Sequence, residues 1–297
     1  MRFTMICVWV FVFWLFCTGV SISQTAKGLV EEFTQNANAA DQTAVEIKIL
    51  TSANHATEKD LVIFERTIYL YEDLKERMRR VTFRGVLPSG EPADHWISQI
   101  ERKGKLERVV DGGNTTSTAS MFESMLDPFE ACISSYSDAP KARPGFLLAQ
   151  FAAAEVIREE ETAKEYVVEL QLGKFARRSI VFSKSHGNMP VRSTWKCTWD
   201  KTKNRSYESS DDKDYIITIA DTVCDWARHG SRWVPVLCEN NHVVGPINAS
   251  PRSTQRMSFR WLGEKVAKEL GQEAANIQVV DKFKTSFESA LSKTDGR

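Results

Sequence analysis

The residue types that could do chemistry are scattered through this chain. There is no G-x-S-x-G motif to nominate a nucleophilic serine. The histidines lie far apart, and no two have the H-x-x-x-H spacing that puts two imidazoles on one helical face. The only adjacent glycine pair, Gly112 and Gly113, lacks the lysine of a phosphate-binding loop. We therefore predict no cofactor, no metal site and no enzymatic activity.

One set of polar residues has a metal-like spacing. Asp221, Asp225 and His229 fall four residues apart, which would align three ligands on a helix. The surrounding run IITIADTVCDW favours a strand, where that spacing does not align the three side chains. We interpret them as polar residues near a hairpin turn.

Four cysteines lie beyond the first 23 residues: Cys132, Cys197, Cys224 and Cys238. In an oxidising compartment they could form two disulfides, by any of three connectivities. Cys224 and Cys238 flank a predicted hairpin, where the simplest register offsets them by roughly three residues. A bond between them therefore needs a bulge or a longer turn. Buried free thiols are the other interpretation, and the spacing does not choose between the two.

The start of the chain has the pattern of an export signal. Arg2 precedes the apolar run Met5–Phe16, and the small residues Ser21 and Ser23 precede a cut near Ser23. The run has 12 residues, whereas a membrane-spanning helix needs about 20. We expect an exported protein, periplasmic or extracellular, with no transmembrane span in the mature chain. Retention as an anchor is one alternative. Lipid attachment at Cys17 is another, although the bulky Phe16 disfavours it.

Composition argues against a nucleic-acid partner. Lysine and arginine together number 39, as do aspartate and glutamate, and cleavage of the signal removes only Arg2 from this balance. A nucleic-acid binder would show a basic surplus concentrated on one face. With 42% hydrophobic residues, the chain has a globular composition.

Period-two alternation of apolar residues predicts about ten strands, which occur in two groups. In the second group, Trp226 and Trp233 are expected to face each other across a hairpin that turns at His229 and Gly230. Strong helix formers predict helices at 27–38, 122–134, 145–157, 264–270 and 279–291. The resulting fold class is α+β: a large curved antiparallel sheet with helices covering its concave face and a helical C-terminal tail. We divide the chain into a signal peptide (1–23), a sheet domain (24–262) with a helical insert at about 122–158, and the tail (263–297).

This ordering of elements resembles the LolA-like (outer-membrane lipoprotein-sorting) periplasmic family, in its large, divergent planctomycete-type members. The segments that carry the resemblance are GNMPVRSTWKCTW from Gly187, GSRWVPV from Gly230 and MSFRW from Met257. The resemblance implies a half-open β-barrel closed by helices, whose apolar interior carries acyl chains of lipids or lipoproteins. No single ligand-binding residue of that family can be matched onto this sequence.

We therefore expect an exported, non-enzymatic protein that binds an apolar ligand within a curved β-sheet. Tryptophans on the predicted strands are compatible with such a face and equally with a filled aromatic core. By alternation, the candidate lining residues of the apolar cavity are Phe64, Ile68, Trp96, Ile100, Trp195 and Trp199. The alternative is a secreted interaction or scaffold protein with a filled core. A secreted hydrolase without a visible motif is the third interpretation.

Overall fold

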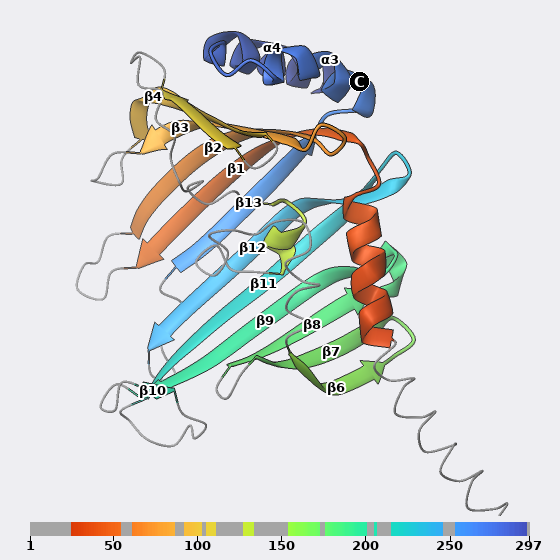
Figure 1. Cartoon of the computed structure of the whole chain (residues 1–297). Coiled ribbons are helices and arrows are strands. Elements are labelled where there is room, and N and C mark those ends of the chain that lie inside the picture. The colour runs from red at the N-terminus through yellow and green to blue at the C-terminus, as the bar shows by residue number, and fades with distance from the viewer. Residues whose placement is uncertain are drawn as a thin grey trace, which may run out of the picture.

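One antiparallel sheet of 13 strands organises the computed structural model of the chain (Figure 1). The structure describes residues 25–54, 61–86, 92–102, 105–110, 127–133, 154–172, 176–200, 205–206, 215–245 and 253–295. The strand order is β5-β4-β3-β2-β1-β13-β12-β11-β9-β8-β7-β6, and β10 pairs with β9. The sheet curves strongly but does not close, because β5 and β6 end the order at opposite sides. The predicted α+β fold class is confirmed.

The sheet has two halves that meet at the pairing of β1 with β13. The first half contains β1 (Gln42–Asn54), β2 (Leu61–Asp73), β3 (Met78–Val86), β4 (Pro92–Arg102) and β5 (Lys105–Val110). The second half contains β6 (Glu155–Glu161), β7 (Glu165–Leu172), β8 (Ala176–Ser183), β9 (Met189–Asp200), β10 (Arg205–Ser206), β11 (Tyr215–His229), β12 (Arg232–Gly245) and β13 (Ser253–Trp261).

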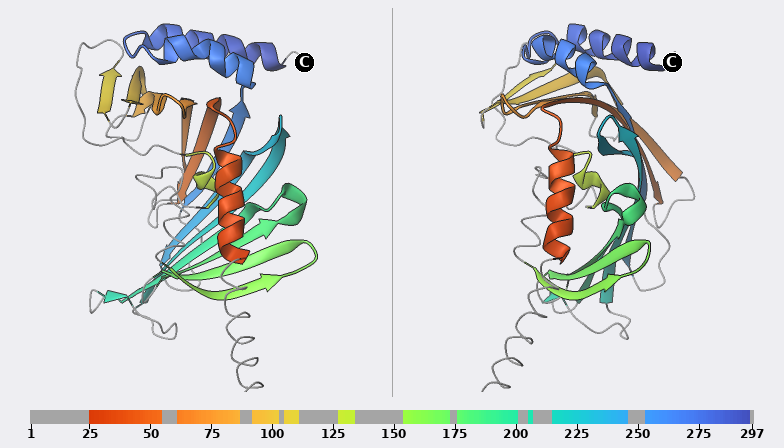
Figure 2. Two further views of the ribbon diagram at one scale, coloured as in Figure 1. Left: turned by 45° about the vertical axis from the view of Figure 1, so that its right-hand side comes forward. Right: turned by 90° about the vertical axis from the view of Figure 1, so that its right-hand side faces the viewer.

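Alternation along the strands gives the sheet two different faces. On β1, Val45, Ile47 and Ile49 are buried in one apolar cluster, while Ala44 belongs to a second cluster on the opposite side. The first cluster fills the concave face, where the N-terminal helix (residues 25–37) and residues 127–133 lie (Figure 2). The second cluster lies on the outer face of the first half, beneath two C-terminal helices.

The N-terminal helix attaches to the second half of the sheet. Its apolar side chains Ala26, Leu29, Val30 and Phe33 are buried in the concave cluster. Near its end, Asn36 donates its side-chain amide to the Trp233 carbonyl (2.7 Å) and accepts the Trp233 backbone N–H (2.9 Å). These paired hydrogen bonds fix the helix against the β11–β12 hairpin.

The C-terminal helices α3 (Glu264–Ala274) and α4 (Val280–Asp295) cover the outer face of the first half. The fully buried Arg80 of β3 donates to the carbonyls of Glu273 and Asn276, both at 2.8 Å. Its guanidinium also lies 4.1 Å from the centre of the Phe283 ring. Because the last carbonyls of a helix lack intrahelical partners, Arg80 caps α3. Burial lowers the pKa of Arg80 to about 10. None of the described helices is both long and apolar enough to cross a membrane.

The structure corrects the predicted helical insert at those of its residues that the structure describes. Glu155, Val156 and Ile157 belong to strand β6 and not to the end of a helix. Pairing with β7 outweighs the local helix propensity, because β6 places Val156 opposite Leu170 in the concave cluster. Of the predicted helix 122–134, the described residues 127–133 contain only a single 3-10 turn, Glu130–Cys132. The rest of the predicted insert lies outside the described residues.

The β11–β12 hairpin forms as expected, but its register differs in one respect. A bulge after Asp225 shifts the pairing, so that Cys224 lies directly opposite Cys238. Between this bulge and the turn, Trp226 pairs with Pro235 and Trp233 with Arg228. The prediction that the two tryptophans face each other is wrong, because the turn consists of Gly230 and Ser231 and so lies one residue later than His229 and Gly230.

Candidate functional site

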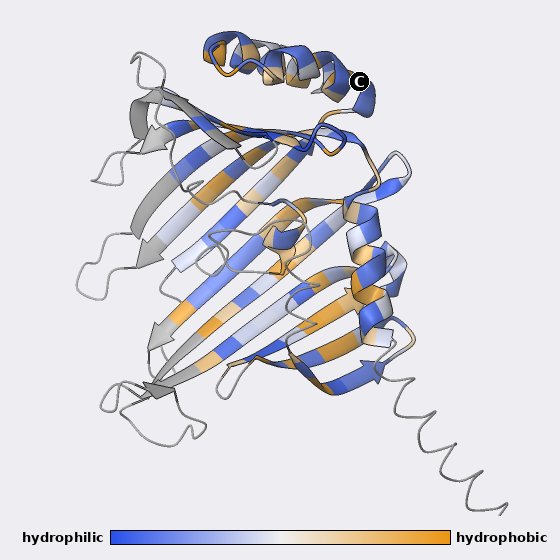
Figure 3. Ribbon diagram, in the orientation of Figure 1, coloured by the Kyte–Doolittle hydropathy of each residue, from blue (hydrophilic) through white to orange (hydrophobic). Residues whose placement is uncertain are grey.

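An apolar row crosses the concave face at the junction of the two halves. Its members are aligned in register on β13, β1, β2, β3 and β4: Phe259, Ile47, Ile68, Phe83 and Ile97. All five side chains are buried. Figure 3 shows hydrophobic segments recurring from strand to strand across this part of the sheet. Because successive strands lie about 4.8 Å apart, the row is about 19 Å long.

A polar row lies beside the apolar row, and the two rows share strands β13 and β1, where their members are four residues apart. Its members are aligned on β9, β11, β12, β13 and β1: Ser193, Thr222, Asn240, Gln255 and Thr51. Ser193 donates its hydroxyl to the carbonyl of Ile133 (2.8 Å), and the Gln255 amide nitrogen donates to the Thr51 hydroxyl (3.4 Å). Between the two rows lie the buried side chains of Cys238, Met257 and Ile49.

Several polar atoms on this face are buried without a hydrogen-bond partner among the described residues. They include the side-chain oxygens of Asn240 and Gln255, and both amide atoms of Gln99 on β4. Gln99 is fully buried, and Asn240 is 4% exposed. Buried polar groups in native proteins are nearly always hydrogen-bonded. These groups are therefore candidates for contact with a ligand on the concave face.

A charged cluster joins residues 127–133 to both halves of the sheet. The Asp127 carboxylate accepts the backbone N–H groups of Phe129 (2.9 Å) and Glu130 (3.3 Å). Burial raises the pKa of the neighbouring Glu72 carboxyl, and the positive charges of Arg79 and Arg232 oppose that shift. The negative charges of the acids and the positive charges of the arginines offset one another. This attraction holds residues 127–133 over the concave face.

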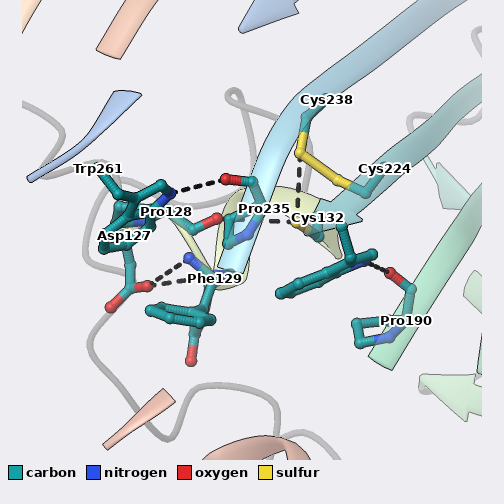
Figure 4. The surroundings of a disulfide bond; sticks show 11 residues. Asp127, Pro128, Phe129, Cys132, Pro190, Cys224, Pro235, Cys238 and Trp261 are labelled. Atoms are coloured by element: carbon teal, nitrogen blue, oxygen red, sulfur yellow. Dashed lines mark hydrogen bonds between the residues drawn. A yellow bond between two sulfur atoms is a disulfide. The ribbon is translucent and has the colours of Figure 1, made fainter. Parts of the chain in front are cut away.

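Three cysteine sulfurs gather under the same segment (Figure 4). Cys224 and Cys238 form a disulfide, and the Sγ of Cys132 lies 3.2 Å from that of Cys238. Burial raises the pKa of the Cys132 thiol well above its ordinary value. The thiolate is the nucleophile and the metal ligand, so this environment favours an inert thiol. Cys197 is not in a disulfide.

The structure separates the six residues predicted to line a cavity. Ile68 belongs to the apolar row, and Trp195 lies half-buried on β9, where it pairs with Ala220. Phe64 and Trp199 lie on β2 and β9, and their side chains are outside the described part of the structure.

Trp96 and Ile100 occupy the outer face, so the expectation that all six share one face is wrong. Trp96 stacks on Tyr69 with 5.5 Å between ring centres, and Lys284 of α4 lies 5.0 Å from its ring. Ile100 is buried in the outer cluster. The cause is alternation on β4, where Ile97 points to the concave face and its neighbour Trp96 to the opposite one.

Sequence reasoning missed the polar row. A signal for it exists, because Asn240, Gln255 and Thr51 each lie two residues from an apolar residue of the same face: Cys238, Met257 and Ile49. Residues two apart on a strand share a face. A polar residue in phase with the apolar positions therefore points inward. Recognising that these polar residues form one row required the strand register, which the sequence did not supply.

A separate groove of about 580 Å³ lies between α3 and α4. Acidic residues Glu269 and Glu273 line it together with Lys293. The groove is formed by the two helices themselves and does not reach the rows on the concave face.

Comparisons with known proteins found no matching family model and no matching curated protein. Among solved structures, a DUF1329 family protein from Desulfovibrio piger has a TM-score of 0.44 and 12% identity over 80% of this chain and 91% of its own. A putative outer membrane lipoprotein-sorting protein domain from Vibrio parahaemolyticus has a TM-score of 0.40 and 9% identity over 80% of this chain and 95% of its own. Likenesses of this degree do not assign the chain to a family.

Proposed function

We propose that this chain is an exported, non-enzymatic protein that binds the acyl chain of a lipid or lipoprotein on the concave face of its sheet. The observation that carries the proposal is the apolar row, which crosses five neighbouring strands of a sheet that does not close. A curved open sheet with an apolar inner face is a common setting for a ligand cavity.

The described covering elements support this placement of the ligand. The contacts of the N-terminal helix that we describe go to the second half or to residues 127–133, as in the packing of Phe33 on Trp226 and Phe129. The 3-10 turn likewise lies against β9, β11 and β12. The apolar row, by contrast, has four of its five members on β1–β4 and on β13 only Phe259.

Burial of apolar surface supplies the binding energy. At about 0.8 kcal/mol for each buried methylene, ten methylenes contribute about 8 kcal/mol before the entropy of association is subtracted. A long acyl chain can therefore bind without charged contacts. The sequence resemblance to LolA-like proteins supports the same cargo, and the predicted export signal supports a location outside the cytoplasm.

The direct test starts from mature protein purified from its native host. We expect lipid extraction and mass spectrometry to recover acyl-containing molecules in stoichiometric amounts. We also expect a dansyl-labelled undecanoic acid to bind and to be displaced by unlabelled fatty acid. Absence of both signals would support the scaffold interpretation with a filled core and would reject the carrier.

Two variants locate the site. Ile68→Asn puts an amide into the apolar row and should weaken probe binding at least tenfold. Leu50→Asn is the matched control, because Leu50 is 42% exposed on the outer face of β1, and it should bind as the parent does. Equal binding by both variants would place the ligand elsewhere. Circular dichroism and thermal melting show whether each variant is folded.

A further inference from the structure

We infer that the ligand presents an uncharged hydrogen-bond donor, a hydroxyl or an amide N–H, to Asn240 and Gln255 of the polar row. This inference rests on the proposed function, because it assigns the head group of the same acyl ligand. It names a ligand class, such as an acylglycerol or an N-acyl amide, in place of a free fatty acid.

The first support is the pairing of two acceptor oxygens. Asn240 and Gln255 are directly opposite each other on β12 and β13, so their Cβ atoms lie about 5 Å apart on one face. The Oδ1 of Asn240 and the Oε1 of Gln255 are both buried, and neither accepts a hydrogen bond in the described part of the chain. Asn240 as a whole is only 4% exposed.

The second support is the orientation of the Gln255 amide. Its nitrogen donates to the Thr51 hydroxyl at 3.4 Å. An amide that gives its nitrogen to one neighbour presents its oxygen to the other side. This contact leaves the Oε1 of Gln255 as an acceptor next to the Oδ1 of Asn240. A ligand that donates a hydrogen bond can satisfy both oxygens.

The third support is the position of the pair relative to the apolar row. Four residues separate Gln255 from Phe259 along β13, which corresponds to about 13 Å. The side chain between them on the same face, Met257, is fully buried. An amphiphile whose head group lies at Asn240 and Gln255 can therefore extend its chain toward Phe259 and Ile47.

Charge complementarity favours a neutral head group. The two unpartnered oxygens repel a carboxylate, and two neutral oxygens do not offset the desolvation of an ammonium group. Arg66, which shares this face, has its guanidinium 4.3 Å from the centre of the Phe83 ring. Gln99 offers both a donor and an acceptor, so it does not discriminate between charged and neutral head groups.

The test compares probes that share one saturated 16-carbon chain. Monopalmitoylglycerol donates hydrogen bonds, methyl palmitate does not, and palmitate carries a negative charge. We expect the parent protein to bind monopalmitoylglycerol about tenfold tighter than methyl palmitate, as one or two net hydrogen bonds would give. Palmitate at pH 8 should bind no tighter than the methyl ester.

The variant that removes both acceptors is Asn240→Leu with Gln255→Met, which keeps the side-chain sizes similar. It should bind methyl palmitate at least as well as the parent and lose the preference for monopalmitoylglycerol. The control is Asn241→Leu, because Asn241 lies on the opposite face of β12, where it accepts a hydrogen bond from Thr254. This control should keep the tenfold preference.

The outcomes distinguish the two proposals. If no 16-carbon probe binds the parent, the carrier function fails and this inference fails with it. If the probes bind equally, if palmitate binds best, or if the double variant keeps the preference, the inference alone is overturned. The binding of methyl palmitate to the double variant shows that the variant is folded and that the apolar row is intact.

Discussion

The two halves of the sheet have helices on opposite faces, and the first half adds a buried arginine to its apolar contacts. In the second half, the N-terminal helix covers the concave face with apolar contacts such as Phe33 on Trp226, whose ring centres lie 6.2 Å apart at 90°. In the first half, α3 and α4 cover the outer face, and the buried Arg80 holds them by hydrogen bonds. The first half of the sheet therefore has buried side chains on both of its faces, the apolar row on the concave face and the cluster beneath α3 and α4 on the outer face.

The outer face of the second half differs from that of the first among the described residues. Arg192, Thr194 and Asp221 form a partly exposed hydrogen-bonded group there, with Arg192 donating twice to the Asp221 carboxylate. Such surface ion pairs contribute little to stability. The outer face is therefore solvated in one half and core in the other.

The largest expected effects come from one phenylalanine in each covering element. Phe33→Ala and Phe287→Ala each remove a ring that is 3% or less exposed, and each should lower the free energy of unfolding by about 4 kcal/mol. Hydrogen exchange distinguishes them. Phe33→Ala should accelerate exchange in residues 25–37 and spare α4, and Phe287→Ala should do the reverse. If either variant opens both elements, the halves are not independently covered.

Replacement of Arg80, which caps α3, should have the second-largest effect on stability. Arg80→Met leaves the carbonyls of Glu273 and Asn276 without their donor, at an expected cost of about 3 kcal/mol in urea unfolding. Arg84→Met is the control on the same face of β3, since Arg84 is exposed, and it should change stability by less than about 0.5 kcal/mol. Equal effects would show that the polar attachment of the first half is unimportant.

The disulfide should stabilise the second half by a smaller amount. It closes a loop with a sequence separation of 14 residues, so the double variant Cys224→Ala with Cys238→Ala should lose about 2 to 3 kcal/mol. Cys197→Ala, outside the disulfide, serves as the control. A loss confined to α3 and α4 by hydrogen exchange would contradict the assignment to the second half.

The smallest effect concerns pH and belongs to the first half. Burial raises the pKa of Tyr71 to about 12, and the nearby Asp73 carboxylate adds to the shift. The folded state holds this proton more tightly than the unfolded state, whose phenol titrates near 10. The stabilisation is therefore complete below pH 10 and is lost as the pH rises toward 12, by about 2 kcal/mol.

Urea unfolding of the parent and of Tyr71→Phe between pH 9 and about 12 measures this effect. The variant should have the shallower decline across that interval. If the free energy of unfolding falls equally with pH in the parent and in Tyr71→Phe, the Tyr71 proton does not stabilise the first half.

The sequence predicted the kind of fold well because alternation is a local signal. The strands around Val45, Val168 and Trp195, the hairpin at Gly230 and the helical tail all follow from neighbouring residues. The end of the predicted insert at 155–157 failed because strand pairing with β7 outweighed helix propensity. Trp96 and Ile100 were placed on the wrong face because alternation gives two faces without saying which one is concave. The polar row depends on alignment between distant strands, which a single sequence does not contain.

The pairing at the centre of the sheet has a consequence for how the chain is made. β1 near the start of the chain is flanked on one side by β13, with Val45 opposite Trp261. A chain that emerges N-terminus first cannot complete this central ladder until residue 261 is available, and contacts so distant in sequence form slowly. Late completion of this ladder delays assembly of the two halves into one sheet until the last strand has been made.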